Sequence, residues 1–216
     1  MFRFFAPASL LLFVFSPARA ADVAFKFTEG KNAPVADVVV SLVPLEPERA
    51  AKPAPPSAPV DVTQQAKEFM PRVTPVVVGT RVQFSNHDKV PHQIYSVSDP
   101  KKFEIPLHRP GTETVIEFDQ PGVVAFGCSI HAWMSAYIVV VETPWFALSA
   151  APGAAVVPGV PAGRYRATIW HPRLKTPLER ELTVGADNAP PLALALALEP
   201  EKRVSRLPDA GGAGYR

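Results

Sequence analysis

The chain has 216 residues, with 22 Lys and Arg against 20 Asp and Glu and a formal net charge of +2. This near balance lacks the strongly basic character of a nucleic-acid-binding protein, so we expect no nucleic acid among its partners. The length is sufficient for one large domain or two small ones.

The first 20 residues have the pattern of a secretory signal peptide. Arg3 supplies a positive charge, residues 4–15 are almost all apolar, and residues 18–20 form a small-residue cleavage site. The apolar run is shorter than the roughly 20 residues of a membrane-spanning helix. We therefore expect an exported protein that begins at Ala21, has no membrane span after processing, and lies in the periplasm if the source is a Gram-negative bacterium.

Short strands separated by Pro and Gly are predicted along most of the chain, because alternating apolar and polar residues recur and helical periodicity is nearly absent. The first two strands are expected at 23–27 and 35–43. Residues 44–59 contain six prolines among Ala, Glu, Arg and Lys, a composition typical of an extended linker. We place this linker at 49–59.

Closely spaced strand patterns follow the linker. Strands are expected, in order, at 60–62, 69–78, 81–84, within 87–98, and at 112–118, 124–128 and 137–141. Such spacing without a long helical segment predicts a sandwich or a barrel. A further unit is expected after residue 142, with strands at 164–170, 179–184 and 192–198. The polar, Gly-rich tail at 200–216 is predicted to be disordered.

Cys128 is the only cysteine of the chain, so it cannot form the internal disulfide that is usual in exported proteins. His131 follows three residues later and Met134 three residues after that. A thiolate, an imidazole and a thioether form a soft ligand set that favours copper. Two histidines and one cysteine with a weak axial methionine make the blue-copper electron-transfer arrangement. A second histidine must therefore come from elsewhere.

Four other histidines could complete this set: His87, His92, His108 and His171. We choose His92, because it follows a proline at the end of a strand-and-loop segment. His87 lies in a polar turn, where solvation is expected, and is the alternative ligand. His108 and His171 flank prolines and are expected at the surface. Met70 is expected in the core.

Zinc is the competing metal, since it also accepts Cys and His ligands. The segment offers one thiolate only, no carboxylate at ligand spacing, and a thioether where copper proteins place one. These features favour copper.

Residues 60–142 resemble the cupredoxins of the plastocyanin and amicyanin type. The resemblance rests on Gly-Thr-x-Val-x-Phe-x-Asn at 79–86 with Pro91-His92, and on Phe-Gly-Cys-x-x-His-x-x-Met at 126–134. It implies a cupredoxin Greek-key β-sandwich with one type 1 copper, held by His92, Cys128 and His131 as equatorial ligands and by Met134 as the axial ligand. Many cupredoxins carry Asn after the first ligand histidine, where this chain has Gln93. The whole chain also resembles exported bacterial proteins labelled methylamine utilisation proteins.

Residues 32–42 and 160–165 resemble parts of carboxypeptidase regulatory-like and transthyretin-like sandwiches. The resemblance implies a second small β-sandwich that is discontinuous in sequence, built from 21–48 and 143–199, with the cupredoxin domain inserted at 60–142. The expected fold class is therefore all-β.

The function implied by the resemblance is that of an exported one-electron carrier. A periplasmic redox protein would dock near His131 and Trp133, on an apolar collar completed by Ile130, Ala132 and Pro91; packing at the domain edge is the other interpretation of Trp133. The alternative function is that of a copper-binding chaperone or sensor. Copper enzymes of the oxidase or nitrite-reductase type need further histidines, often in His-x-His pairs, which this chain lacks, so we expect no enzyme.

Overall fold

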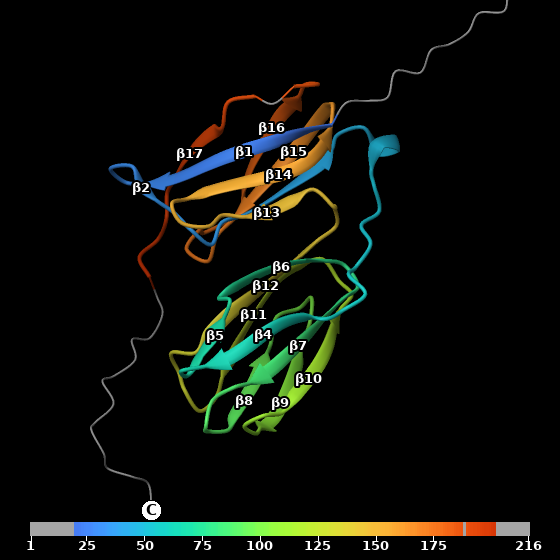
Figure 1. The fold of residues 1–216 in the computed structure, drawn as a ribbon. Coiled ribbons are helices and arrows are strands. Elements are labelled where there is room, and N and C mark those ends of the chain that lie inside the picture. The colour runs from blue at the N-terminus through green and yellow to red at the C-terminus, as the bar shows by residue number, and fades with distance from the viewer. Residues whose placement is uncertain (1–19, 188, 202–216) are drawn as a thin grey trace, which may run out of the picture.

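Two β-sandwiches lie one above the other in the computed structural model, which describes residues 20–187 and 189–201 (Figure 1). The predicted signal peptide falls outside the described residues except for Ala20, and the predicted disordered tail except for Pro200 and Glu201. Among the described residues, no helix is long and apolar enough to cross a bilayer.

The first sandwich consists of the strands between residues 60 and 141. One sheet has the order β10-β7-β4-β5 and the other the order β6-β12-β11-β8-β9. The strands are β4 (Val60–Gln65), β5 (Glu68–Met70), β6 (Val73–Val77), β7 (Thr80–Asn86), β8 (His92–Ser96), β9 (Phe103–His108), β10 (Glu113–Phe118), β11 (Gly122–Cys128) and β12 (Ser135–Val141). The chain passes repeatedly between the two sheets, as expected for a Greek-key sandwich.

Apolar side chains, which alternate with more exposed ones along the strands, fill the core of the first sandwich. On β11, Val124, Phe126 and Cys128 are all buried on one face, as the sequence predicted. Phe84 of β7 is fully buried and meets Phe126 edge-on, with ring centroids 5.4 Å apart. This apolar core supports the end of β11 from which Cys128 projects.

The second sandwich is built from strands on either side of the first sandwich in sequence. Its sheets have the orders β14-β1-β17, with β2 paired to β1, and β13-β3-β15-β16. The strands are β1 (Ala20–Glu29), β2 (Ala33–Pro34), β3 (Val39–Pro44), β13 (Phe146–Leu148), β14 (Ala154–Pro161), β15 (Gly163–Trp170), β16 (Leu178–Val184) and β17 (Leu192–Leu196). The all-β fold class, with a cupredoxin-type sandwich and a second sandwich, is confirmed.

Apolar side chains join the two sandwiches. Ile138 and Val140 of β12 point into the core of the first sandwich, whereas Val139 and Val141 point outward into a separate buried cluster. In the same cluster, Tyr137 meets Trp170 of β15 with ring centroids 5.3 Å apart. Both faces of β12 are thus covered, which explains its uninterrupted run of valines.

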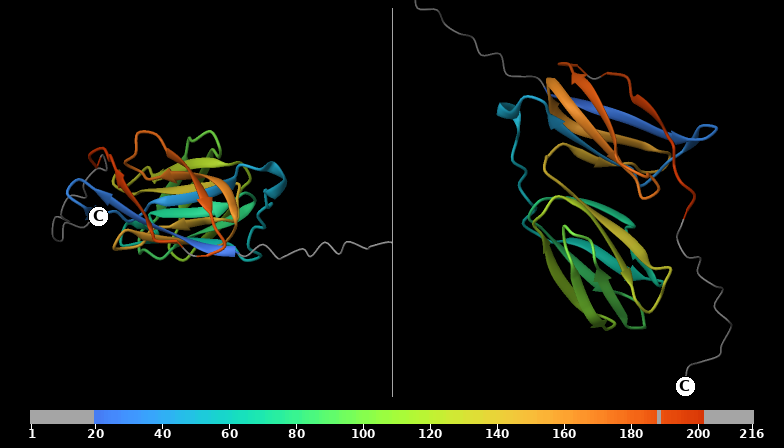
Figure 2. Two further views of the ribbon diagram at one scale, coloured as in Figure 1. Left: turned by 90° about the horizontal axis from the view of Figure 1, so that it is seen from above. Right: turned by 180° about the vertical axis from the view of Figure 1, so that it is seen from behind.

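Two stretches of chain run along the sides of the sandwiches. The Pro-rich stretch, which includes a short 3-10 helix (Pro47–Arg49), runs down one side of the molecule (Figures 1 and 2). The stretch after β17 runs down the other side (Figure 1). There Glu201 accepts two hydrogen bonds, of 3.0 and 3.1 Å, from the guanidinium of Arg72 in the first sandwich.

The chain crosses between the sandwiches twice, between β3 and β4 and between β12 and β13. Both crossings lie away from the Cys128 loop. β4 begins after the first crossing and runs parallel to β7, so that Gln64 pairs with Asn86 at their far ends. β11 ends at the same pole, because its following loop reaches the turn after β4 through a bond from Trp133 Nε1 to the Lys67 carbonyl. β12 starts at this pole and carries the chain back. Both chain connections to the second sandwich therefore lie at the opposite pole, whereas the second sandwich itself packs against the outer face of β6 and β12 along their length.

Some sequence expectations differ from the structure. The strand expected at 35–43 begins only at Val39 and forms β3, because Asp37 adopts a positive φ of 61° that interrupts the extended backbone. The strand expected at 69–78 is divided at Pro71 into β5 and β6, which belong to different sheets. β9, β13 and β14 were not predicted.

Three side-chain placements were also wrong. Met70, expected in the core, is 53% exposed because side chains alternate along β5 and its neighbour Phe69 is the one that points inward. His108, expected at the surface, is buried on β9, where its Nδ1 lies 3.0 Å from Gln64 Oε1. His171 is also buried, and its Nδ1 accepts a hydrogen bond from the backbone N–H of Arg173. Each histidine is buried with a polar partner that local sequence does not indicate.

We expect Phe84→Ala to lower the free energy of unfolding of the metal-free protein by about 3–5 kcal/mol, because it leaves a cavity at the centre of the aromatic cluster. Chemical denaturation checks this value. Val97→Ala is the control, since Val97 is 76% exposed and its truncation should cost less than about 0.5 kcal/mol. Equal losses in both variants would contradict the assignment of this core.

Candidate metal centre

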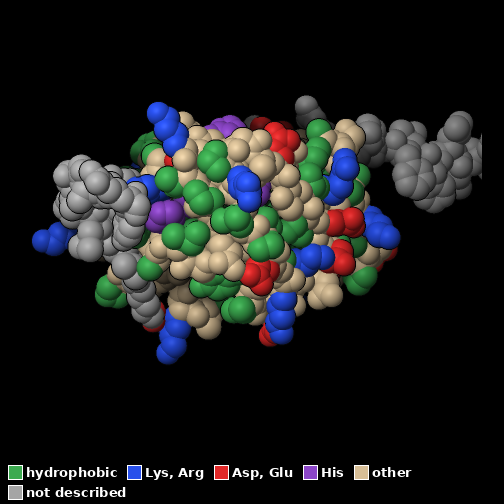
Figure 3. Space-filling view, turned by 90° about the horizontal axis from the view of Figure 1, so that it is seen from below, with side chains coloured by type: hydrophobic (Ala, Val, Ile, Leu, Met, Phe, Trp, Pro, Cys, Tyr) green, Lys and Arg blue, Asp and Glu red, His purple; other side chains and the backbone are tan. Residues whose placement is uncertain are grey.

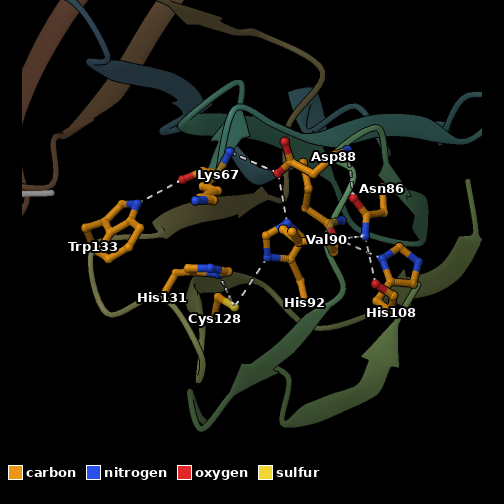
Figure 4. Close-up of polar contacts among 10 residues, drawn as sticks. Lys67, Asn86, Asp88, Val90, His92, His108, Cys128, His131 and Trp133 are labelled. Atoms are coloured by element: carbon orange, nitrogen blue, oxygen red, sulfur yellow. Dashed lines mark hydrogen bonds and ion pairs between the residues drawn. The ribbon is translucent and has the colours of Figure 1, made fainter. Parts of the chain in front are cut away.

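Three predicted ligands meet at one pole of the first sandwich. Cys128 Sγ lies 3.7 Å from His92 Nδ1 and 3.7 Å from His131 Nδ1 (Figure 4). The three ligand atoms all lie within 4.8 Å of one another, and no other group of three potential metal-binding His, Cys, Asp or Glu side chains is found in the described part of the chain. The separations suit an ion about 2.3 Å from sulfur and about 2.0 Å from nitrogen, lengths typical of such bonds.

Different elements supply these side chains. His92 is the first residue of β8 and is fully buried, and Cys128 is the last residue of β11. The two strands pair directly here, with Cys128 opposite Ile94. His131 lies on the loop between β11 and β12 and is only half-buried. The site is therefore rigid on its inner side and reaches the surface on its outer side.

Backbone hydrogen bonds close the loop from Cys128 to Met134. The Cys128 N–H donates to the Met134 carbonyl at 3.1 Å, and the Met134 N–H donates to the His131 carbonyl at 2.9 Å. A Cβ atom on Gly127 would lie only 3.2 Å from the Met134 carbonyl oxygen, so glycine permits this close approach. Met134 is 1% exposed and belongs to the same buried cluster as Cys128.

Gln93 of β8 also stabilises this loop through hydrogen bonds. Its backbone carbonyl accepts the Ser129 N–H at 3.1 Å, and its side-chain Oε1 accepts the Ser129 hydroxyl at 2.8 Å. Its side-chain amide also donates to Glu104. Although Gln93 replaces the Asn expected from the resemblance, it still holds the residue that follows Cys128.

The polar surroundings favour a thiolate at Cys128. Burial alone would raise the pKa of Cys128, but its hydrogen bond with His92 and the nearby backbone groups of Gln93, Ile130 and His131 outweigh burial, so the pKa lies below its ordinary value. Burial likewise opposes the charged form of His92, yet its contacts with Cys128 and Asp88 raise the pKa of the imidazole. The pocket thus stabilises positive charge beside the sulfur, which suits a bound cation.

The outer side of the site carries apolar side chains. His131 lies against Trp133 with ring centroids 5.2 Å apart. Ile130 is 53% exposed, and Pro91 and Ala132 are also exposed. Figure 3 shows the molecule from below, where hydrophobic side chains lie among charged ones and histidine side chains reach the surface. Trp133 both packs against the turn after β4 and lies beside the exposed edge of His131.

The structure brings together His92, Cys128 and His131 and buries Met134 close by, whereas His87 is exposed. Sequence reasoning missed Asp88, whose carboxylate lies 2.8 Å from His92 Nε2. Its position four residues before His92 was visible, but only the folded loop shows that the two side chains meet.

Comparison with solved structures finds copper proteins. A purple cupredoxin from Nitrosopumilus maritimus is 26% identical, covers 38% of this chain and 99% of its own, and has a TM-score of 0.35. A copper-containing nitrite reductase (NirK) from Thermus scotoductus SA-01 is 32% identical over 46% of this chain and 27% of its own, with a TM-score of 0.38. A reduced mutant of amicyanin is 18% identical over 47% of this chain and 98% of its own, with a TM-score of 0.37.

No family model matches the chain, and no curated protein matches it. Because all three TM-scores lie below 0.5, we base the assignment of the site on its own geometry. A buried thiol, two imidazoles whose Nδ1 atoms face it, and a buried thioether fit copper by donor type.

We expect metal binding to weaken as the pH falls. The raised pKa of His92 means that its proton begins to compete with the metal above the ordinary value of 6.5. Binding should be complete above the pKa of His92 in the folded protein and should be lost progressively below it. Competition titrations with a chelator of known affinity, from pH 8 down to pH 5, check this. A constant affinity over that range would contradict the proposed ligand role of His92.

Proposed function

We propose that this protein is an exported type 1 copper protein that carries single electrons to or from a periplasmic redox partner. The observation that carries the proposal is the buried Cys128 thiol, which lies at equal distances of 3.7 Å from two imidazole Nδ1 atoms. His92, Cys128 and His131 would hold the ion equatorially, and Met134 would be the axial ligand. Copper bound in such a site exchanges one electron between its two oxidation states.

The residues around the site support electron transfer without substrate binding. His92 and Cys128 are held by β8 and β11, and Met134 is fixed by the closed loop, so the ligand positions change little. A rigid site needs little rearrangement when its charge changes. A chaperone or sensor must release its metal, whereas here three of the four side chains are almost completely buried. This burial favours the carrier over the metal-handling alternative.

Docking would take place at the apolar collar formed by Pro91, Ile130, Ala132 and Trp133. Trp133 lies against the half-buried ring of His131, and Ile130 and Ala132 adjoin His131 in the chain, so a partner that covers these residues would come close to the metal. The chain connections to the second sandwich lie at the opposite pole, and its apolar contact is with the outer face of β6 and β12. We also propose that residues 1–20 direct export and are removed.

The visible spectrum tests the copper site. We expect the protein with Cu(II) to show an intense thiolate-to-copper charge-transfer band, because Cys128 would ligate directly. Cys128→Ser should lose the band and retain its fold, since the two side chains are nearly equal in size. A colourless protein that binds Zn(II) or Cu(I) without this band would refute the carrier and support a metal-handling role.

Electron self-exchange tests the docking surface. We expect Ile130→Lys to slow exchange between the oxidised and reduced protein about tenfold, a change of about 1.4 kcal/mol in the barrier, because two lysines would then meet at the contact. NMR line broadening measures the rate. Val156→Lys is the matched control, since Val156 is 51% exposed on β14 of the second sandwich. Equal slowing in both variants would show that the collar has no special role.

A further inference from the structure

The two ring nitrogens of His92 face different partners. Nδ1 faces the Cys128 sulfur, and Nε2 lies 2.8 Å from the carboxylate oxygen Oδ2 of Asp88 (Figure 4). The His92 side chain is fully buried, and that of Asp88 is 10% exposed. The contact is thus an almost dry pairing between a ring nitrogen and a carboxylate.

Charge and hydrogen-bond chemistry fix the position of the proton in this pair. A neutral imidazole has one donor nitrogen and one acceptor nitrogen, and an ionised carboxylate can only accept. His92 Nε2–H therefore donates to Asp88, which leaves the lone pair of Nδ1 directed at the site where a metal would bind. A hydrogen bond of this kind orients a ligand histidine and increases its donor strength.

Asp88 is itself held by two backbone-linked bonds. Its Oδ2 accepts the Lys67 N–H at 2.9 Å, and its own N–H donates to Asn86 Oδ1 at 2.9 Å. Lys67 lies in the turn between β4 and β5, where Ala66 and Lys67 have positive φ values of 54° and 56°. The carbonyl of the same lysine accepts the Trp133 indole N–H. One hairpin turn therefore supports both Asp88 and the aromatic ring beside His131.

We propose that Asp88 is a positioning residue of the metal centre, which keeps the proton of His92 on Nε2 and favours the oxidised over the reduced metal. The proposal rests on the proposed function only for its redox part. The negative carboxylate stabilises the ion of higher charge more strongly, so it should lower the reduction potential. It should also strengthen metal binding by fixing the ring before the metal arrives.

The test begins with the metal-free wild-type protein, which needs no variant. At a pH above the pKa of His92, where the ring is neutral, we expect nitrogen-15 NMR to show its single proton on Nε2, with slow exchange because the ring is buried. A proton on Nδ1 would overturn the proposal directly. This result is independent of whether the protein carries electrons.

Asp88→Asn then removes the charge with little change in shape. We expect its affinity for Cu(II) to fall about 10–100-fold, as is typical for loss of a partner of a ligand histidine. Cu(I) affinity should fall less, so the reduction potential should rise. Asp119→Asn is the matched control: Asp119 is an exposed carboxylate of the same sandwich, paired with Lys101, and its change should leave both quantities at wild-type values.

Two further outcomes would overturn the proposal. Wild-type affinity and potential in Asp88→Asn would show that the carboxylate does not act on the ligand. An equal loss of Cu(II) and Cu(I) affinity with an unchanged potential would show that Asp88 only stabilises the local structure. A titration with Zn(II), which has no redox chemistry, separates the two proposals: if wild-type protein lacks the visible copper band but Asp88→Asn still weakens Zn(II) binding, the positioning role stands and the carrier function fails.

Discussion

The candidate site depends on the short pairing between the ends of β8 and β11. These strands pair only at Gly127 with Tyr95 and at Cys128 with Ile94, yet this contact brings a cysteine next to a histidine 36 residues earlier in the chain. Both strands are anchored in the same apolar core, which holds Ile94 and Phe126 in place. Because the backbone sets the position of both ligands, the site exists before any metal binds.

Electrostatics then determines which ion this pocket can hold. A buried thiol would normally resist ionisation, but the adjacent imidazole and backbone groups reverse that tendency. The Asp88 carboxylate acts on the far side of His92. The Asp88 carboxylate, the His92 imidazole and the Cys128 sulfur therefore lie in sequence across a buried region, and the sulfur and imidazole donors favour a soft cation.

The second sandwich contacts the first through side chains that lie outside the candidate site. Its apolar contact with the outer face of β6 and β12 buries Val73, Val77, Val139 and Val141, and the Arg72–Glu201 pair adds a partly exposed link at the side. Exposed ion pairs contribute little to stability, so the apolar cluster is the main bond between the sandwiches. The loop that carries His131 lies at the pole away from the two chain crossings.

The sequence by itself determined the all-β fold class, most of the strands and the donor types of the candidate site. Cys128, His131 and Met134 are close in the chain, so their chemistry could be identified without a fold, and alternation at Val124, Phe126 and Cys128 predicted which face is buried. Only the tertiary structure decided the contacts of residues distant in sequence. It placed His108 in the interior beside Gln64, Met70 on an exposed edge, and Asp88 between the Lys67 turn and His92. Local sequence patterns carry no information about such long-range contacts, because these contacts depend on which strands pair and on how the loops between them close.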